Sequence, residues 1–241
     1  MQNRHHVKKS TLGVLTLGQS PRTDVIPTLR AILGGSVSLI EAGGLNALSS
    51  EELAYLAPRQ GERGIETRLS SGSSLLVARG RLLPLLVEAF GRLEADCARV
   101  LLLCSGEFPD LVPLCPGLIQ PVFALRSIVG GLASNSTLGI VGPASDMDDA
   151  PFQWSPFAAR VVCAAASPYE PPRALSEASV RLRSEGADLI FLDDMAFTEE
   201  QRRMAASVSR LPALCASTLT ARFLFELFSP LAEVEDSCPR I

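Results

Sequence analysis

Histidine is nearly absent from this chain of 241 residues, whose only two histidines are His5 and His6 in the N-terminal tail. A Ser-His-Asp triad needs a histidine held beside its nucleophile, and many zinc sites use histidine ligands. A pair of histidines in a tail supplies neither arrangement. The sequence therefore predicts no histidine-based metal site and no such triad, and we expect no cofactor.

The cysteines also lack the spacing of a metal site. None forms a CxxC pair, and none has a histidine nearby at zinc spacing. Scattered cysteines in an acidic chain are typical of a reducing cytoplasm. The six cysteines are Cys97, Cys104, Cys115, Cys163, Cys215 and Cys238.

Basic charge and long apolar runs are missing too. The formal net charge is −4, and the lysines and arginines form no basic stripe, so nucleic acid is not an expected partner. The sequence contains no run of about 18 apolar residues, the length that could span a membrane. The first residues lack the apolar core and small-residue cleavage site of a secretion signal. We therefore expect a cytoplasmic protein that has no membrane or nucleic-acid partner.

Short runs rich in Val, Ile and Leu alternate with longer helical patterns along most of the chain. This alternation predicts parallel sheets built from βαβ units, with one hairpin in the first half. The expected strands are 12–17, 37–42, 99–104, 118–122, 137–141, 160–165, 189–192 and 213–216, with hairpin strands 67–69 and 75–78. The main expected helices are 25–33, 82–94, 175–185, 199–208 and 218–228.

The pattern runs through two similar rounds. "ARVLLLC" (98–104) is echoed by "ADLIFLDD" (187–194), and each follows an amphipathic helix. We expect two lobes with a cleft between them, with ligands bound beyond the carboxyl ends of the strands. The predicted first lobe comprises 10–133 and 217–228, the second comprises 134–216, and 1–9 and 229–241 are predicted to be flexible ends.

Cys104 ends the most apolar strand of the first round and precedes Ser105 and Gly106. A thiolate can remove a proton beside a carboxylate if neighbouring donors lower its pKa. Backbone N–H groups at the Ser105–Gly106 turn could bind a carboxylate, and the Ser105 hydroxyl adds a donor. The alternative is that Cys104 is a small buried apolar residue.

Asp193 and Asp194 end an apolar strand of the second round, a costly place for two carboxylates. One interpretation makes Asp194 an acid/base group that faces Cys104, with Asp193 anchoring a loop. The other lets both carboxylates cap the next helix or bind turn amides. Counting from Ala98 and Ala187 aligns Cys104 with Asp193.

Other strand ends supply candidate ligand-binding residues, each of which also has a purely structural interpretation. The loop after the first strand offers amide, hydroxyl and guanidinium donors for a carboxylate or phosphate, or else is a proline turn with a surface arginine. Arg68 could reach the cleft or lie solvated on its strand, and Tyr169 could bind a ligand or pack inside. The remaining candidates are Gln19, Ser20, Arg22, Gly142, Pro143 and Ser167. We interpret Trp154 as a packing anchor.

The chain resembles the AroM family over about residues 11 to 228. The resemblance is carried by segments in a fairly specific order and spacing: "TLGQSPR" (16–22), "EAGGLNALSSEEL" (41–53), "TRLSSG" (67–72), "LLLCSGEFPDL" (101–111), Trp154, "SPY" (167–169), "GADLIFLDDMAFT" (186–198) and "LTARFLFEL" (219–227).

That family is similar to the aspartate/glutamate/hydantoin racemase group. The resemblance implies an α/β fold of two flavodoxin-like parallel-sheet lobes with pseudo-twofold symmetry. It also implies one cysteine per lobe on opposite faces of a substrate α-carbon. Cys104 matches the first cysteine, but the second strand ends Leu192-Asp193-Asp194 where the family commonly has Leu-Asp-Cys. The family pattern therefore puts Asp194 in the second cysteine's place.

Three functions stay open at this point. The first is a cofactor-independent racemase, epimerase or isomerase that acts on a small carboxylate or amino acid, with Cys104 as thiolate base. The second is a single-thiol decarboxylase or lyase. The third is a non-catalytic carboxylate-binding protein with an unreactive Cys104. The family resemblance also leaves a homodimer open.

Overall fold

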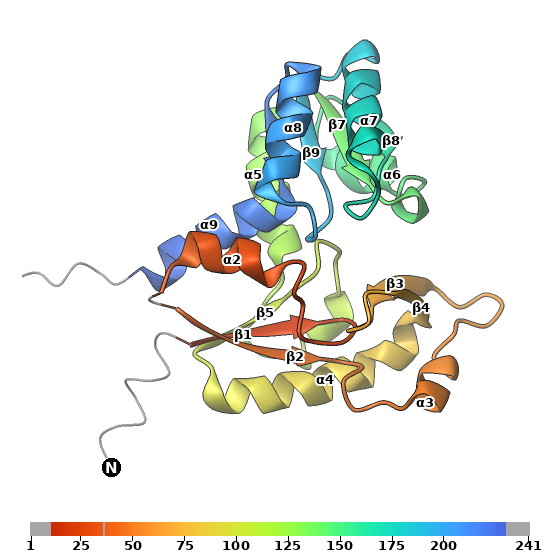
Figure 1. The fold of residues 1–241 in the computed structure, drawn as a ribbon, viewed down its shortest axis with the longest axis vertical. Helices are drawn as coiled ribbons and strands as arrows, with labels where there is room; N and C mark the ends of the chain where they lie inside the picture. Colours follow the sequence, from red (N-terminus) through yellow and green to blue (C-terminus); the bar gives the residue numbers. More distant parts are fainter. Residues whose placement is uncertain (1–10, 36, 230–241) are drawn as a thin grey trace, which may run out of the picture.

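The computed structural model describes residues 11–35 and 37–229. The predicted flexible ends 1–9 and 229–241 lie outside this part of the chain, except for Ser229. Two four-stranded parallel sheets dominate the fold (Figure 1). The first sheet contains β1 (Thr11–Thr16), β2 (Ser38–Gly43), β5 (Arg99–Leu102) and β6 (Leu118–Ile119). The second contains β7 (Thr137–Gly142), β8 (Arg160–Ala165), β9 (Leu189–Leu192) and β10 (Ala213–Cys215).

The two sheets have the same topology. Their strand orders are β2-β1-β5-β6 and β8-β7-β9-β10. In both sheets the second strand along the chain lies at one edge, followed in space by the first, the third and the fourth. The β1 strand is buried along its whole length and the β9 strand likewise, as expected for parallel sheets covered on both faces. The predicted α/β fold of two related lobes is confirmed.

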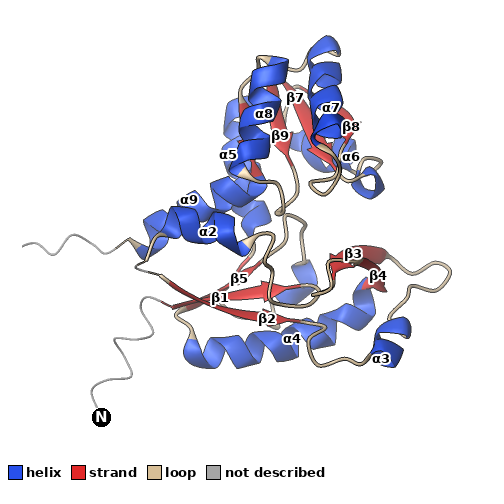
Figure 2. Ribbon diagram, viewed as in Figure 1, coloured by secondary structure: helices blue, strands red, loops and turns tan. Residues whose placement is uncertain are grey.

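Helices cover both faces of the sheets (Figure 2). The last helix, α9, returns from the second sheet and packs against α2 of the first lobe. The α-helices are α2 (Ile26–Leu33), α3 (Ser50–Ala54), α4 (Arg79–Asp96), α5 (Pro121–Ala133), α6 (Ala150–Trp154), α7 (Pro172–Ser184), α8 (Glu199–Ser209) and α9 (Ala216–Phe228). Three short 3-10 turns are η1 (Pro109–Leu111), η2 (Ala144–Asp146) and η3 (Ser155–Phe157).

The predicted strand at 118–122 is wrong in its second half. The strand β6 has only two residues, and Pro121 opens the thirteen-residue helix α5. Proline suits the first turn of a helix because its missing N–H has no partner there in any case. The rest of α5 was not predicted, because Gly130 and Gly131 have weak helix propensity. The short helix α6 was also not predicted.

The predicted hairpin is present as antiparallel β3 (Gly64–Arg68) and β4 (Ser74–Ala78). It projects from the first lobe beside the carboxyl end of β1, where Gln19 donates its backbone N–H to the Arg68 carbonyl at 3.0 Å. Gly18 makes this approach possible, since a Cβ there would lie 2.0 Å from that same carbonyl oxygen. The hairpin therefore lies close to the loop after β1.

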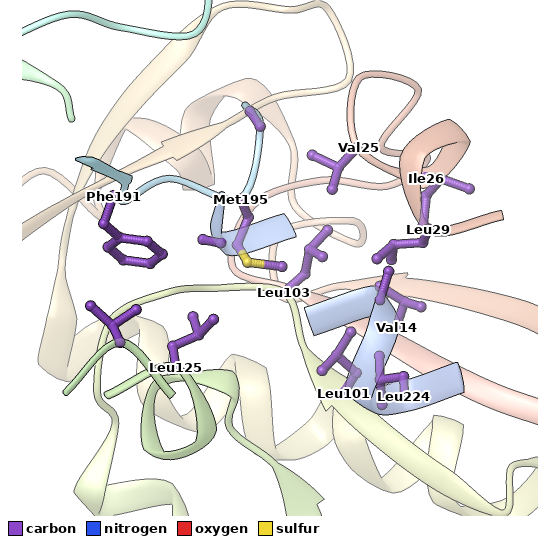
Figure 3. Close-up of a cluster of buried hydrophobic side chains, with 14 of the residues drawn as sticks. Val14, Val25, Ile26, Leu29, Leu101, Leu103, Leu125, Phe191, Met195 and Leu224 are labelled. Carbon is purple, nitrogen blue, oxygen red and sulfur yellow. The ribbon is translucent and has the colours of Figure 1, made fainter. Parts of the chain in front are cut away.

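One buried hydrophobic cluster runs through both lobes (Figure 3). It contains Val14 and Leu101 of the first sheet, Phe191 of the second sheet, and Leu125 of α5. The division of the chain at residues 133 and 216 stays a prediction, because this shared core joins the two lobes. No helix in the described part of the chain is long and apolar enough to cross a membrane.

Candidate functional site

The ladder register shows which residues of the two lobes are equivalent. Beyond the last residue of β5, Leu103 donates its N–H to the Leu15 carbonyl at 2.8 Å. Beyond the last residue of β9, Asp193 donates its N–H to the Val141 carbonyl, also at 2.8 Å. Both acceptors are the penultimate residues of central strands, and each is paired with the last residue of the neighbouring strand.

Leu103 and Asp193 are therefore equivalent, and so are Cys104 and Asp194 one residue later. Counting from Ala98 and Ala187 is off by one residue, because hydrogen bonds to the first residues of β1 and β7 align Ala98 with Asp188. The structure gives Asp194 the position that matches Cys104, as the family resemblance implies.

The Cys104 thiol lies half-buried where β5 ends. The Gly106 N–H donates a hydrogen bond to its sulfur at 3.3 Å, which favours the thiolate. Burial dominates, however, and the nearby charges of Asp194, Asp193 and Asp146 act in the same direction, so the pKa of Cys104 rises to about 12. The ligand-free thiol therefore keeps its proton at neutral pH.

Asp193 is held by the tryptophan of α6. The Trp154 Nε1 atom donates a hydrogen bond to Asp193 Oδ2 at 2.8 Å. Burial raises the pKa of Asp193 to about 6, and the charges of Asp194 and Asp146 add to the rise, while the Trp154 and Ser105 hydrogen bonds oppose it. The contact with Ser105 links this carboxylate to the Cys104 turn.

Asp194 is oriented by its own turn, because the Ala196 N–H donates a hydrogen bond to Asp194 Oδ1 at 2.7 Å. Burial raises the pKa of Asp194 to about 6, although the Ala196 N–H and the charge of Arg22 lower it. The site therefore contains a neutral thiol from one lobe and, near it, a weakly basic carboxylate from the other lobe.

Replacing Trp154 by phenylalanine is expected to destabilise the protein mainly where Asp193 is ionised. Phenylalanine keeps an aromatic group but is smaller than the buried indole, so a packing loss that does not depend on pH accompanies the loss of the indole donor to the carboxylate. A hydrogen bond to a charged group contributes about 1.5 to 3 kcal/mol. Urea unfolding should show a loss of about 2 kcal/mol at about pH 8 and a smaller loss at about pH 5, where more Asp193 is protonated. An equal loss at both pH values would contradict this role.

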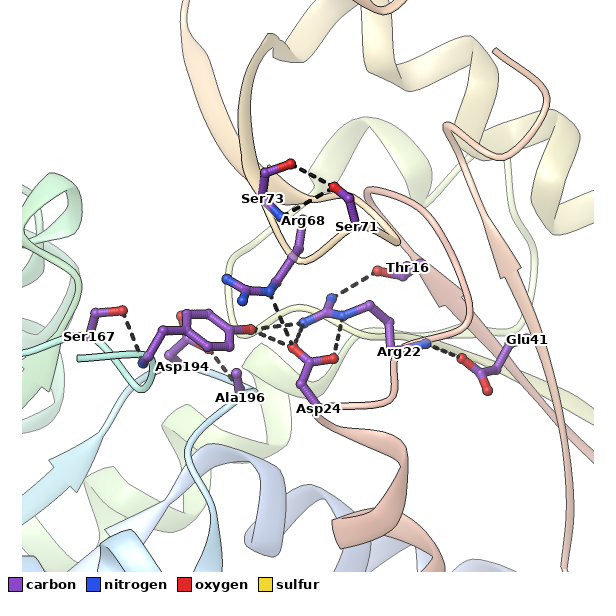
Figure 4. Close-up of polar contacts among 11 residues, drawn as sticks. Thr16, Arg22, Asp24, Glu41, Arg68, Ser71, Ser73, Ser167, Asp194 and Ala196 are labelled. Carbon is purple, nitrogen blue, oxygen red and sulfur yellow. Dashed lines mark hydrogen bonds and ion pairs between the residues drawn. The ribbon is translucent and has the colours of Figure 1, made fainter. Parts of the chain in front are cut away.

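A second polar cluster lies where the two lobes meet (Figure 4). The Arg22 guanidinium binds the Asp24 carboxylate through Nε and Nη2, both at 2.9 Å, and donates through Nη1 to Thr16 Oγ1 at 3.1 Å. Its backbone N–H donates to Glu41 at 2.7 Å. Although burial opposes it, hydrogen bonds from Arg22 and Tyr169 lower the pKa of Asp24 to about 2.

Tyr169 is the residue through which the second lobe contacts this cluster. Its hydroxyl donates a hydrogen bond to Asp24 Oδ2, and Arg22 Nη2 lies 3.4 Å from the same hydroxyl. The Arg68 guanidinium stacks over the tyrosine ring, 3.4 Å from the ring centroid. Arg68 thus reaches the boundary between the lobes, and its Nε lies 3.9 Å from Asp24 Oδ2.

Gln19 and Ser20 make hydrogen bonds within the first lobe. Gln19 Oε1 accepts from the backbone and the hydroxyl of Ser70, both at 3.0 Å. The Ser20 hydroxyl accepts from Asn46 Nδ2 at 2.8 Å, and Asn46 Oδ1 accepts from the Ser20 N–H. In this state both residues position loops, and ligand binding by them stays a prediction.

The remaining predicted residues shape the second-lobe side of the site. Gly142 ends β7 next to Asp193, since a Cβ there would lie in ordinary van der Waals contact with the Asp193 carbonyl oxygen at 3.5 Å and closer, at 3.0 Å, to the end of the Met147 side chain. Pro143 precedes the turn η2, which carries Asp146. The Ser167 hydroxyl accepts the Tyr169 N–H at 3.4 Å and so orders the loop after β8.

Sequence reasoning missed Asp24, Asp146 and the bond from Trp154. Asp24 follows Arg22 by two residues, and this spacing alone could have suggested a local ion pair. No pattern places Asp146 near the other two carboxylates, because that proximity depends on loops that converge in space.

Two surface hollows lie elsewhere on the molecule. One of about 290 Å³ is lined by residues such as Arg126 and Phe157, and another of about 430 Å³ by residues such as Ile40 and Arg92. Neither lining includes Cys104. Within residues 11–35 and 37–229, no group of three or more histidine, cysteine or acidic side chains could hold a metal ion.

Comparisons with known proteins place this fold. It is similar to that of unliganded arylmalonate decarboxylase, at a TM-score of 0.56 and 14% sequence identity, covering 92% of this chain and 94% of that one. A second arylmalonate decarboxylase structure gives a TM-score of 0.54 at 12% identity, covering 88% of both chains. At these identities the likeness shows the fold alone.

The sequence itself identifies the family. No curated protein matches it significantly. The family model described as AroM protein matches residues 12–228, nearly the whole described chain. The resemblance inferred from the sequence is confirmed, and the chain belongs to the AroM family.

Proposed function

We propose that this protein is a cofactor-independent enzyme that transfers a proton at the α-carbon of a small carboxylate or amino acid. Cys104 is the proton donor, and Asp194 is the opposing acid/base group. One observation carries the proposal: Cys104 and Asp194 hold equivalent positions at the ends of β5 and β9. The charge of Asp194 also acts on the Cys104 thiol, which supports a site where a group from each lobe acts on one carbon atom.

The protonation states of the two side chains indicate which one is the acid and which one is the base. The pKa of the thiol is about 12 and that of the carboxylate about 6, so near neutral pH Asp194 is mostly ionised and Cys104 is mostly neutral. This assignment reverses the thiolate-base role expected from the sequence and makes Cys104 the acid. The stronger base in the resting pair is the Asp194 carboxylate.

Racemisation or epimerisation would use both groups. Asp194 takes the α-proton, and the C–H electron pair moves into the substrate carboxylate to give an enediolate. The S–H bond of Cys104 then breaks as a new C–H bond forms on the opposite face. The enediolate needs hydrogen-bond donors, and the N–H groups of the turn after Cys104 are suited to this role. Proton exchange between the thiolate and protonated Asp194 restores the starting state.

A decarboxylase or lyase is the second candidate, and the neutral thiol favours it. Loss of CO₂ from a malonate-like acid breaks the C–C bond and leaves the same enediolate without any base. Cys104 then donates its proton to that carbon, and the resulting thiolate takes a proton from water to restore the thiol. The structural neighbours named as arylmalonate decarboxylase share only the fold, so this candidate rests on the protonation state of the thiol.

A carboxylate-binding protein without turnover is the third candidate. A thiol with a raised pKa is a poor nucleophile, which is the property expected of a structural Cys104. This candidate predicts ligand binding without proton exchange. Cytoplasmic location and a homodimer also stay predictions.

Proton exchange in heavy water separates the three candidates. Single enantiomers of amino acids and a set of malonate-like acids are incubated with the protein and followed by NMR and chiral chromatography. Deuterium at the α-carbon with appearance of the opposite enantiomer supports racemisation. CO₂ release with a deuterated product of one handedness supports decarboxylation. Neither exchange nor CO₂ release across the set would contradict the enzymatic proposal.

A further inference from the structure

The Tyr169 side chain crosses from the second lobe to the first. It follows β8, whereas its contacts lie in the loop after β1 and in the β3–β4 hairpin. Its hydroxyl is bound to Asp24 and lies within reach of Arg22, and its ring lies under the Arg68 guanidinium. A hydrogen bond and a cation–π contact therefore hold this one side chain against the other lobe.

The first-lobe half of this contact is fixed by its own lobe. Gln19 binds the Arg68 carbonyl through its backbone and binds Ser70 through its side chain. Arg22 is anchored by the Glu41 carboxylate and the Thr16 hydroxyl. These bonds would hold the two arginines in place when Tyr169 moves away.

The second-lobe half is fixed in the same way. Gln201 of α8 donates its side-chain amide to the Pro168 carbonyl at 2.8 Å. The Ser167 N–H donates to Glu170 at 2.7 Å, and the Tyr169 N–H lies 3.4 Å from the Ser167 hydroxyl. The polar contact between the halves is made by side chains only, so it can break without unfolding either lobe.

We propose that Tyr169, Asp24, Arg22 and Arg68 form a latch between the lobes that must open before a ligand reaches Cys104. The latch borders the site, because Asp194 lies beside the Tyr169 side chain (Figure 4) and the charges of Arg22 and Asp24 act on Asp194. While it is closed, both guanidiniums are directed at the carboxylate of Asp24. Opening removes the Tyr169 hydroxyl from Asp24 and Arg22, and the ring from Arg68, which leaves donors that a ligand carboxylate can take.

The rate at which Cys104 is alkylated tests the latch. The Tyr169→Phe variant removes the hydroxyl and keeps the ring, and Asp24→Asn removes the charge that both arginines contact. The control is Tyr55→Phe, since Tyr55 is the only other tyrosine and is 78% exposed. Iodoacetamide labelling at fixed pH is followed by mass spectrometry of the Cys104 peptide, with buried Cys97 and Cys115 as internal references.

We expect Tyr169→Phe to raise the Cys104 rate about fivefold and Asp24→Asn about tenfold, because each shifts the population toward the open state. Tyr55→Phe should match the wild-type protein. Rates at Cys104 that equal the control in both variants would overturn the proposal. An equal rise at Cys97 and Cys115 would also overturn it, since that result means general loosening. Labelling needs no turnover, so failure of the proposed enzymatic activity leaves this test intact.

Discussion

Replacing Cys104 by serine is expected to lower α-carbon exchange by about 1,000-fold, within the range that a positioned acid or base contributes. Serine keeps the size and polarity of the side chain, but its hydroxyl is a far weaker acid than a thiol. The enediolate would then lack its proton donor. The measurement is deuterium incorporation or CO₂ release with whichever substrate the wild-type protein turns over.

The matched control is Cys163→Ser. Cys163 is another half-buried free cysteine, located on β8, and it has no role in the proposed chemistry. Its serine variant should keep most of the exchange activity. Full activity in Cys104→Ser, with the control also active, would remove Cys104 from the mechanism and leave only the fold assignment.

Replacing Asp194 by asparagine is expected to stabilise the protein while it lowers racemisation by about 100-fold or more. Asparagine keeps an oxygen for the Ala196 N–H, the hydrogen bond that now orients the carboxylate. It removes a buried charge that interacts unfavourably with Asp146. Stability at about pH 8 should rise by about 1 to 2 kcal/mol, the direction common when a costly functional group is removed.

The pH dependence follows from the raised pKa of Asp194. A carboxyl whose folded pKa of about 6 exceeds its usual 3.8 binds protons more tightly in the folded protein. The stability it contributes is fully present below about pH 4 and is lost as the pH rises through 6. Urea unfolding of the two proteins should therefore agree near pH 4 and diverge toward pH 8. An Asp194→Asn variant that is less stable at pH 8 would contradict the unfavourable charge.

A single-thiol decarboxylase would respond differently to the same substitution. Loss of CO₂ needs no base, so Asp194→Asn should retain much of that activity, whereas racemisation should fall by about 100-fold or more. The Asp194 variant thus separates the two enzymatic candidates that the Cys104 variant cannot distinguish.

Much of the fold could be predicted because apolar strands and amphipathic helices leave periodic signals. The runs before Cys104 and before Asp193 are continuous and apolar, as buried parallel strands require. Helix α5 was not predicted, because Pro121 and the Gly130–Gly131 pair are residues that commonly end helices. Tertiary packing outweighs their weak helix propensity. Its buried face packs into the cluster shared by the two lobes.

The candidate site was less accessible to sequence reasoning. Strand ends are visible in a sequence, so Cys104, Asp193 and Asp194 could be selected. The Trp154 contact could not, since it comes from a short helix whose position depends on the whole fold. The spacing of Asp24 from Arg22 indicates a local ion pair, but not the contact of Asp24 with Tyr169 of the other lobe. The protonation states were also hidden, because burial and neighbouring carboxylates set the pKa of Cys104.

The pKa of the Cys104 thiol tests the central claim most directly. It can be measured from the pH dependence of labelling at the Cys104 peptide, in the wild-type protein and in Asp194→Asn. The account predicts a wild-type pKa above about 10, well over the usual 8.5 of a free cysteine, and a lower value once the Asp194 charge is gone. A wild-type pKa at or below about 8.5 would mean that Cys104 is no proton donor of the kind described and would contradict the account.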